Sequence, residues 1–579
     1  MPSETSRTSE SGETSGTASE SDETSKSGET SGATSKSGEI GGGGAAGRDR
    51  VLRAGRLGTA GLLFSVLAAS APLTVVAGVM PTAFAETGVV GQPLLFLALG
   101  AVLLLFSAGY AEMSRPVHHA GALYASMARG LGPTVGAAAS WVALVAYSAL
   151  QAGIYGLLGF EVSGLLDTHL RVVIDWWVPA LLTVALVGGL GRLKTGLNAK
   201  VLGVLLVAEV ALVVVFDGAA LAHPAADRLS LHAFNPHALR RGSLGIALCL
   251  CAAAFTGFEQ APVYAEETRR PRVVVRRVMF LAVSFVTLLF AFSSWALTIA
   301  AGPRDIVDSA QKQGSGLLFA LADRNLGATF TDVLHVVFAT GMFAALLSLH
   351  NVVARYAFAM GRERLLPAGF GRTNADSGAP AAGSLLQTAV SVALVAVFAV
   401  TDRGQPGDPT APVTRMFTCL AGVGALGVVL LMAAVSLAVI VHFVRGGAAR
   451  AQAWRLLAAG ASGTVLLGIA AYTVEQFPAL VGAGPGDTLI RLLPGVVAVA
   501  LLVGLARGLV LRAGRPEAPA GAGRGPGARA GAGSGPEAHG GTGPGPEAHG
   551  GTGPGPAERA GTVPGHEVPS QWRGSNDEL

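Results

Sequence analysis

The chain has 579 residues, of which 51% are hydrophobic and only 13% are charged, and its mean hydropathy is +0.52. These values exclude an ordinary soluble globular protein and indicate a polytopic, all-α membrane protein. The formal net charge of +4 arises mostly from basic loops between apolar segments, so it gives no support for nucleic-acid binding.

The two ends of the chain have biased compositions. Residues 1–47 are mostly Ser, Thr, Gly and Glu, and residues 513–579 are rich in Gly, Pro, Ala and Glu, with a GPEAHGGTGP repeat. Neither can bury enough apolar surface to offset its chain entropy. We therefore predict disordered cytoplasmic tails, either regulatory or dispensable, around a transmembrane domain at residues 55–512.

Apolar segments long enough to cross a bilayer fill the region between these tails. We predict about twelve spans, of which the fourth is short. Their ranges are 59–85, 92–112, 133–160, 177–191, 199–221, 243–265, 276–301, 329–357, 381–400, 413–443, 454–474 and 489–511. Lys and Arg gather in alternate loops, which places both termini in the cytoplasm. Residues 315–325 have the spacing of a short surface helix.

Two spans, the first and the sixth, are interrupted near their middles. The first contains Ser70-Ala71-Pro72-Leu73-Thr74, and the sixth contains Thr256-Gly257-Phe258-Glu259-Gln260-Ala261-Pro262. Proline removes a backbone donor and glycine adds freedom, and such breaks persist in lipid only where they face protein or a cavity. A matched pair of breaks predicts the binding site of a transporter. It also divides ten spans into a five-plus-five inverted repeat with two additional helices.

Several polar side chains are predicted at membrane depth. Tyr147, Gln151 and Tyr155 share one helix face, which lines a substrate path or packs against neighbouring helices. Glu259 either accepts N–H groups of the broken backbone or takes part in gating.

In the eighth span Asn351 is a candidate for the pathway, and Arg355 is expected to extend outward to the cytoplasm. His335 and His442 receive no role, and the three cysteines are expected to be packing residues.

Separated motifs resemble bacterial permeases of the amino acid–polyamine–organocation superfamily. Residues 255–259, Glu266-Glu267 and Arg270-Pro271-Arg272 are similar to the sixth-helix signature of that family. Residues 351–356 with 361–367 resemble its eighth helix and the following loop. Gly121-Ala122-Leu123-Tyr124 and Ala71-Pro72-Leu73-Thr74 also fit. The resemblance covers roughly residues 55–510.

The resemblance implies a LeuT-type fold that carries amino acids or related amines across the plasma membrane. Free N–H groups at one half-helix suit a carboxylate, and free carbonyls at the other suit an ammonium group. Carboxylate binding is then expected at Ser70, Ala71, Pro72, Leu73, Thr74 and Val75. Binding of the amino group and the side chain is expected at Ala254, Phe255, Thr256, Gly257 and Phe258.

Glu209 lies in the middle of the fifth span, where an ionisable residue is costly and usually functional. By the resemblance, it falls where some proton-coupled relatives carry a protonatable lysine. Our hypothesis is that Glu209 binds the coupling ion, H⁺ or Na⁺, and no other cofactor is expected. The alternative is a neutral carboxylic acid that bonds to a neighbouring helix.

The leading interpretation is a secondary active transporter, not an enzyme. A passive facilitator or exchanger of the same fold and a transporter-like sensor remain alternatives. The sequence contains no HExxH motif and no phosphate-binding loop, which disfavours a membrane enzyme or an ATP-driven pump within this chain. No charged side chain in the expected pocket selects a cationic or anionic substrate, so a neutral one is mildly favoured.

Overall fold

A computed structural model describes residues 57–114, 121–192, 195–226, 229–240, 242–374, 378–402, 412–446, 452–480 and 493–513. In these residues the regular structure is helical, and the only strand-like pairing is the isolated bridge between Leu57 and Thr268. Apart from Ala513, which ends the last described helix, the predicted tails lie outside the described residues, so their boundaries stay predictions.

The described part of the chain contains eleven helices long and apolar enough to cross a membrane. A twelfth, α8 (Trp177–Leu190), is apolar but shorter, as predicted for the fourth span. The multi-span, all-helical fold is therefore confirmed. The uninterrupted long helices are α5 (Gln92–Ser114), α7 (Pro133–Leu170), α9 (Thr195–Ala222), α11 (Pro271–Ala301), α14 (Ala328–Arg362), α15 (Ala381–Asp402), α16 (Thr418–Arg445), α17 (Ala453–Glu475) and α20 (Pro494–Ala513).

Short helices connect or extend these spans. α6 (Ala122–Leu131) precedes α7, and a π-helical turn, η7 (Pro412–Phe417), precedes α16. The connection between α11 and α14 folds into α12 (Ile306–Gln313), η5 (Gly314–Gly316) and α13 (Leu317–Leu326). The short surface helix predicted at residues 315–325 is therefore present. The remaining short pieces are η2 (His232–Phe234), η3 (Pro236–Leu239), η6 (Ala368–Gly371) and α18 (Phe477–Leu480).

The first span is broken at Ser70 and Ala71, within the predicted cluster. Helix α2 (Thr59–Ala69) stops there, and Ala71 has a left-handed backbone with φ 42° and ψ 65°. Pro72 then starts α3 (Pro72–Thr74). Proline is tolerated at this position because the backbone N–H groups in the first turn of a helix have no acceptor within the helix, and its fixed φ suits a helix start. A π-helical segment, η1 (Val75–Val79), leads into α4 (Met80–Thr87).

The sixth span is broken at Phe255–Gly257. Helix α10 (Leu244–Ala254) ends there, and Gly257 has φ 133° and ψ −42°, a conformation that side chains strongly disfavour. The chain continues as the 3₁₀ helix η4 (Phe258–Glu267), which contains Pro262. Both predicted interruptions are thus present, at the first and sixth spans, as the five-plus-five arrangement requires.

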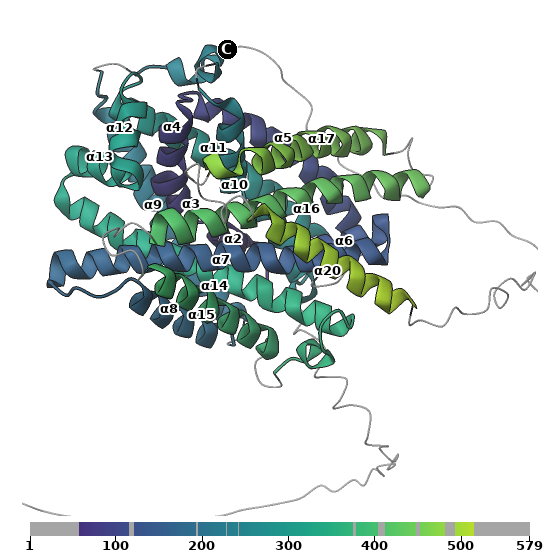
Figure 1. Cartoon of the computed structure of the whole chain (residues 1–579). Helices are drawn as coiled ribbons and strands as arrows, with labels where there is room; N and C mark the ends of the chain where they lie inside the picture. The colour runs from purple at the N-terminus through teal and green to yellow at the C-terminus, as the bar shows by residue number, and fades with distance from the viewer. Residues whose placement is uncertain are drawn as a thin grey trace, which may run out of the picture. The chain divides into compact units, whose positions relative to one another are not determined.

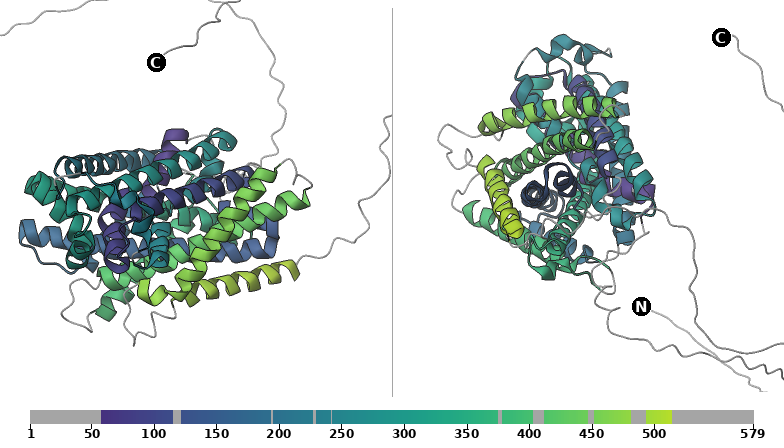
Figure 2. Two further views of the ribbon diagram at one scale, coloured as in Figure 1. Left: turned by 90° about the horizontal axis from the view of Figure 1, so that it is seen from above. Right: turned by 90° about the vertical axis from the view of Figure 1, so that its right-hand side faces the viewer.

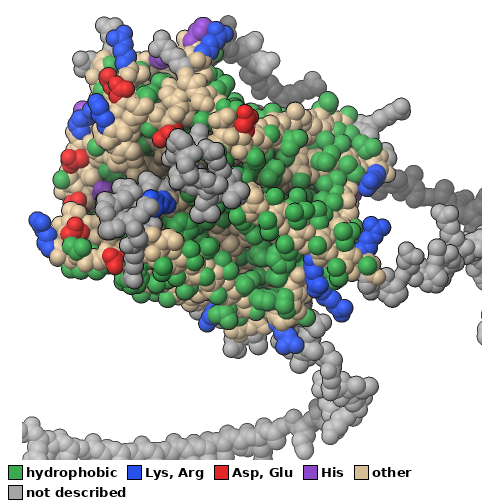
Figure 3. Space-filling model, in the orientation of Figure 1, with side chains coloured by type: hydrophobic (Ala, Val, Ile, Leu, Met, Phe, Trp, Pro, Cys, Tyr) green, Lys and Arg blue, Asp and Glu red, His purple; other side chains and the backbone are tan. Residues whose placement is uncertain are grey.

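The long helices run roughly side by side, with α7 in the interior of the bundle against α14, α16 and α20 (Figures 1 and 2). Large apolar side chains such as Leu182, Val204 and Leu288 are more than half exposed. On the face shown in Figure 3, apolar side chains cover the middle, and charged ones gather at the two ends. This distribution suits a bundle whose middle contacts lipid chains.

Candidate functional site

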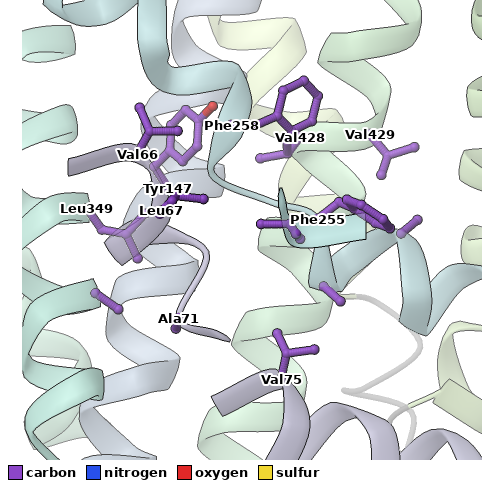
Figure 4. Packing of buried hydrophobic residues seen from close by; sticks show 14 of the residues in the cluster. Val66, Leu67, Ala71, Val75, Tyr147, Phe255, Phe258, Leu349, Val428 and Val429 are labelled. Atoms are coloured by element: carbon purple, nitrogen blue, oxygen red, sulfur yellow. The ribbon is translucent and has the colours of Figure 1, made fainter. Parts of the chain in front are cut away.

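The two breaks touch each other through their backbones. A Cβ atom built at Gly257 would lie 2.6 Å from the Ser70 hydroxyl oxygen and 2.9 Å from the Ser70 nitrogen. Only glycine therefore fits at this contact. In Figure 4, Ala71 lies in the non-helical stretch of the first span, and Phe255 and Phe258 flank the second break. The sequence motifs at the breaks thus form one structural unit.

A cavity of about 480 Å³ starts at this unit, within the roughly 300–1,000 Å³ typical of ligand pockets. Its walls are mainly apolar, and the exposed residues Gln313 and Gly316 take part in its outer lining, so it extends to the surface. The main contributors are the breaks, α7, α10, α14, η7 and α16, with two residues from η5 and single residues from α4, α12, α13 and α17.

The residues predicted for substrate binding divide between the cavity wall and the packing behind it. Those that line the cavity are Ser70, Ala71, Thr74, Val75, Ala254 and Thr256. Those outside the lining are Pro72, Leu73, Phe255, Gly257, Phe258, Tyr147, Gln151 and Asn351. The hydroxyl oxygens of Thr74 and Thr256 are buried, and neither has a hydrogen-bond partner among the described residues. A place for these two hydroxyl groups in substrate binding stays a prediction.

Glu209 joins α9 to the first break. It is fully buried, and its Oε1 accepts the backbone N–H of Leu73 at 2.5 Å, whereas Oε2 has no partner in the described part of the chain. The carboxyl group lies against α14 at Gly341, where an added Cβ would be 2.9–3.0 Å from it. A change in the charge of Glu209 would therefore act directly on the N-terminal turn that follows the break.

Glu259 holds the second break from within. Its Oε2 accepts the backbone N–H of Gly257 at 2.8 Å, and its Oε1 accepts the Tyr147 hydroxyl at 2.9 Å. The carboxyl group thereby supplies an acceptor to a backbone donor that the broken helix leaves without one. This geometry corresponds to the first of the two roles predicted for Glu259, and it ties the break to α7.

The polar stripe on α7 forms a network between helices. Gln151 donates to the Tyr155 hydroxyl and to the Leu346 carbonyl, and its own carbonyl accepts from Gln387 on α15. Ser148 donates its hydroxyl to the side-chain oxygen of Gln387 at 2.8 Å. All of these groups are buried, and the α7 residues that line the cavity lie on an adjacent face. A place for Tyr147 and Gln151 in substrate contact stays a prediction.

The expectation that Arg355 extends outward is wrong. Its side chain is 3% exposed and makes a two-pronged ion pair with Glu267, with Nε–Oε1 at 2.5 Å and Nη2–Oε2 at 3.2 Å. It also donates to the carbonyl of Asn351 and lies over the Tyr264 ring. The carboxylate at the end of η4 makes burial possible because it pairs the guanidinium, which would otherwise need water.

Comparisons with known proteins agree with this architecture. A family model described as "Amino acid permease" matches residues 57–499. The chain belongs to this family. It therefore falls within the amino acid–polyamine–organocation superfamily, as its motifs indicated, and the relatives below are membrane transporters.

Two curated relatives of this chain are named for different substrates. The branched-chain amino acid permease BcaP of Lactococcus lactis subsp. cremoris is 26% identical over 338 residues, which cover 55% of this chain and 70% of BcaP. The low-affinity putrescine importer PlaP of Escherichia coli K12 is 25% identical over 284 residues. That match covers 47% of this chain and 60% of PlaP, less than two thirds of its length.

One end of the permease is closed by contacts around Glu267. The backbone of Leu57, before α2, pairs with residue 267 at the end of η4 and with residue 269 after it. Arg355 pairs with the Glu267 side chain, and Arg362 pairs with Glu266 at 3.0 Å. These bonds join the start of the first span, the end of the sixth and the end of α14. The cavity lies on the opposite side of the breaks from this closed end.

The outer end of the cavity carries a polar pair that sequence reasoning missed. His335 on α14 lies 2.5 Å from Glu161 on α7, and its ring stacks on Phe319 of α13 at 3.8 Å. Glu161 follows directly after the predicted third span, so a longer span would have drawn attention to it. Tyr147, which bonds to Glu259 at the second break, lies fourteen positions before Glu161 on α7, a rise of about 21 Å. The pair is therefore too far from the breaks to contact the same small substrate.

Proposed function

We propose that this permease is a secondary active transporter that takes up a neutral amino acid or a related amine by alternating access. The observation that carries the proposal is the cavity that begins at both broken helices, while the ion pair of Arg355 and Glu267 closes the other end. A site open to one side and sealed from the other is what one half of an alternating-access cycle requires.

The substrate class is inferred from the cavity wall. Among its described lining residues, the charged candidates are Glu161 and His335, which face each other, and the inner part is apolar with hydroxyl groups. In the proposal the main-chain groups near residues 70–75 hold a carboxylate, and the carbonyls near residues 254–258 hold an ammonium group. The relatives carry branched-chain amino acids and putrescine by name, so both classes belong in a screen.

Coupling is assigned to Glu209. As a carboxylate it makes a charge-assisted bond to the N–H of Leu73, and a bound proton weakens that bond and loosens the start of α3. The energy of proton binding is then coupled to the geometry of the first break. Glu259 is given the role of a fixed acceptor that keeps the second break open for the substrate.

The cavity is proposed to face the outside in this conformation. The closed end contains the basic loops after η4 and α14, which the positive-inside rule assigns to the cytoplasm together with both termini. On the face shown in Figure 3, the right-hand end carries Lys and Arg without acidic side chains, whereas the left-hand end, near α12 and α13 in Figure 1, carries acidic and basic side chains together.

The test is uptake into proteoliposomes, with a labelled panel that contains neutral amino acids and putrescine. Under an imposed pH gradient we expect accumulation above equilibrium, which a passive facilitator cannot produce. Glu209→Gln should retain counterflow but lose stimulation by the gradient, because the amide cannot take up a proton. An imposed sodium gradient in place of the pH gradient identifies the ion.

Three outcomes would contradict parts of this proposal. Equilibration without accumulation would indicate a facilitator or exchanger. Substrate binding without any transport would favour a sensor. Unchanged coupling in Glu209→Gln would remove this residue from the ion pathway while leaving the transport function intact.

A further inference from the structure

A second carboxyl group is buried on α9, and the coupling scheme above does not use it. Asp217 is fully buried, and its Oδ2 accepts the Ser293 hydroxyl of α11 at 2.6 Å. Its Oδ1 is also buried and has no hydrogen-bond partner among the described residues. The sequence places Asp217 inside the predicted fifth span, so the criterion that singled out Glu209 applies to it as well.

The hydroxyl of Ser293 bonds to this carboxyl group and not to a backbone carbonyl of its own helix. On the same helix, Thr287, Ser294 and Thr298 each donate to a carbonyl of their own helix one turn earlier. Such local bonds are the common choice of Ser and Thr in helices. Ser293 instead bonds across to α9, so the contact is specific to Asp217.

Asp217 and Glu209 lie on one face of α9. Val213, Phe216 and Ala220 on this face are buried, while Val214 and Val215 on the opposite face are about half exposed. The two carboxyl groups are eight residues apart, a rise of about 12 Å. Asp217 is nearer the C-terminal end of α9, after which the backbone N–H of Ala225 donates to the Ile299 carbonyl of α11. Arg324 of α13 donates to the neighbouring Ala300 carbonyl, and Phe319 of the same helix lines the cavity.

No cation neutralises Asp217 in the described part of the chain. Helices α2 and α3, which pack on α9, contain no ionisable side chain, and the basic residues of α11 are at its far end, at 272–277. Arg324 and Asp323 on α13 are exposed, and Arg324 donates to the Ala300 carbonyl. On α14, Asp332 pairs with His169, His335 with Glu161, and Arg355 with Glu267, and His350 bonds to Ser384.

We propose that Asp217 is a second proton-binding site of the transport cycle, on the mouth side of Glu209. A single hydroxyl donor cannot compensate a full negative charge at this depth. The proton binds at Oδ1, which lacks a donor, and converts the carboxylate to a carboxylic acid while Oδ2 keeps its bond to Ser293. This inference rests on the proposed proton coupling, in which Asp217 receives a proton before Glu209 does.

The first experiment measures protonation directly in the purified, full-length permease. Infrared difference spectra between acidic and alkaline buffer should contain a carbonyl band of a protonated acid that disappears in Asp217→Asn and shifts in Ser293→Ala. Asp308→Asn, an exposed carboxylate on α12, is the matched control and should leave the band unchanged. An identical spectrum in wild type and Asp217→Asn would overturn the proposal.

The second experiment separates a proton site from a merely structural hydrogen bond. Asparagine can still accept the Ser293 hydroxyl, so Asp217→Asn should keep counterflow and thermal stability while losing most of the stimulation of uptake by a pH gradient. This inference alone would be overturned if a pH gradient stimulated uptake fully in wild type and in Asp217→Asn but not in Glu209→Gln. Absence of stimulation in wild type would instead overturn the proposed proton coupling itself.

Discussion

Backbone conformation at single residues fixes where the broken helices stop. Gly257 has a φ of 133°, which residues with a side chain disfavour, and it directly contacts the Ser70 backbone. Position 257 therefore excludes a side chain both by its backbone conformation and by lack of space. Ala71 adopts φ 42° despite its Cβ, which stores strain next to the cavity. Both strained backbone conformations occur where the two helices are interrupted and their end groups are available for bonding.

Gly257→Ala should be strongly destabilising. The disfavoured φ costs about 1–3 kcal/mol, and the clash with Ser70 adds to it by pushing the two breaks apart. Gly460→Ala is the matched control because it lies inside α17 with no atom within 4 Å of the added Cβ. Thermal unfolding in detergent should show a lower midpoint for the first variant and an unchanged or higher one for the second. Equal midpoints would contradict the close contact.

Residue patterns predicted the positions of both breaks but not the partners of the polar groups. Proline and glycine act locally, so Ser70–Thr74 and Thr256–Pro262 could be identified without a fold. The bond from Leu73 to Glu209 spans 136 positions, and the pair of Arg355 with Glu267 spans 88. Such pairs depend on how the helices pack. For the same reason Arg355 was expected in water and is instead buried.

Pairs between elements differ in how much they stabilise the closed end. Arg355 and Glu267 are each about 3% exposed at their side chains, whereas Arg362 is 31% exposed in its pair with Glu266. Loss of Arg355 leaves the Glu267 charge buried without its cation, whereas loss of Arg362 leaves Glu266, whose side chain is 11% exposed. The two arginines on α14 therefore form a natural comparison.

Arg355→Met should cost about 3–5 kcal/mol of folding stability because Glu267 then stays buried without its cation. Arg362→Met should cost less, because Arg362 is 31% exposed and water screens its pair with Glu266. The double variant Arg355→Met with Glu267→Gln should recover part of the loss, since no charge is left unpaired. Denaturation midpoints of the four proteins test this order. A similar loss from both single variants would show that the Arg355 pair is not buried in solution.

At the scale of the whole molecule, the cavity opens at one end, and Cys249 lies on its wall. Its thiol lines the cavity and contacts Thr473 on α17, whereas Cys251 and Cys419 are buried outside the lining. The cysteines were expected to serve only as packing residues. The structure adds that one of them borders the proposed substrate path.

In a Cys251→Ser, Cys419→Ser background, a small charged thiol reagent should modify Cys249 from the outside of sealed cells, and a transported substrate should slow the reaction. The matched control retains Cys251 as the only cysteine and should not react, because that thiol is fully buried. Modification of Cys249 that is faster from the cytoplasmic side, in inside-out vesicles, would reverse the proposed orientation of the cavity.

Helix α7 is longer than a membrane is thick. Its 38 residues correspond to about 57 Å of helix, compared with about 30 Å of hydrocarbon. Glu161 and His169 lie in its last turns, paired with α14. Part of α7 therefore extends beyond the hydrocarbon layer, and its pairs with α14 form a polar rim at the end where the cavity opens. An antibody fragment directed at this rim would reach the seam between α7 and α14 without entering the membrane, and could hold the transporter in a single state.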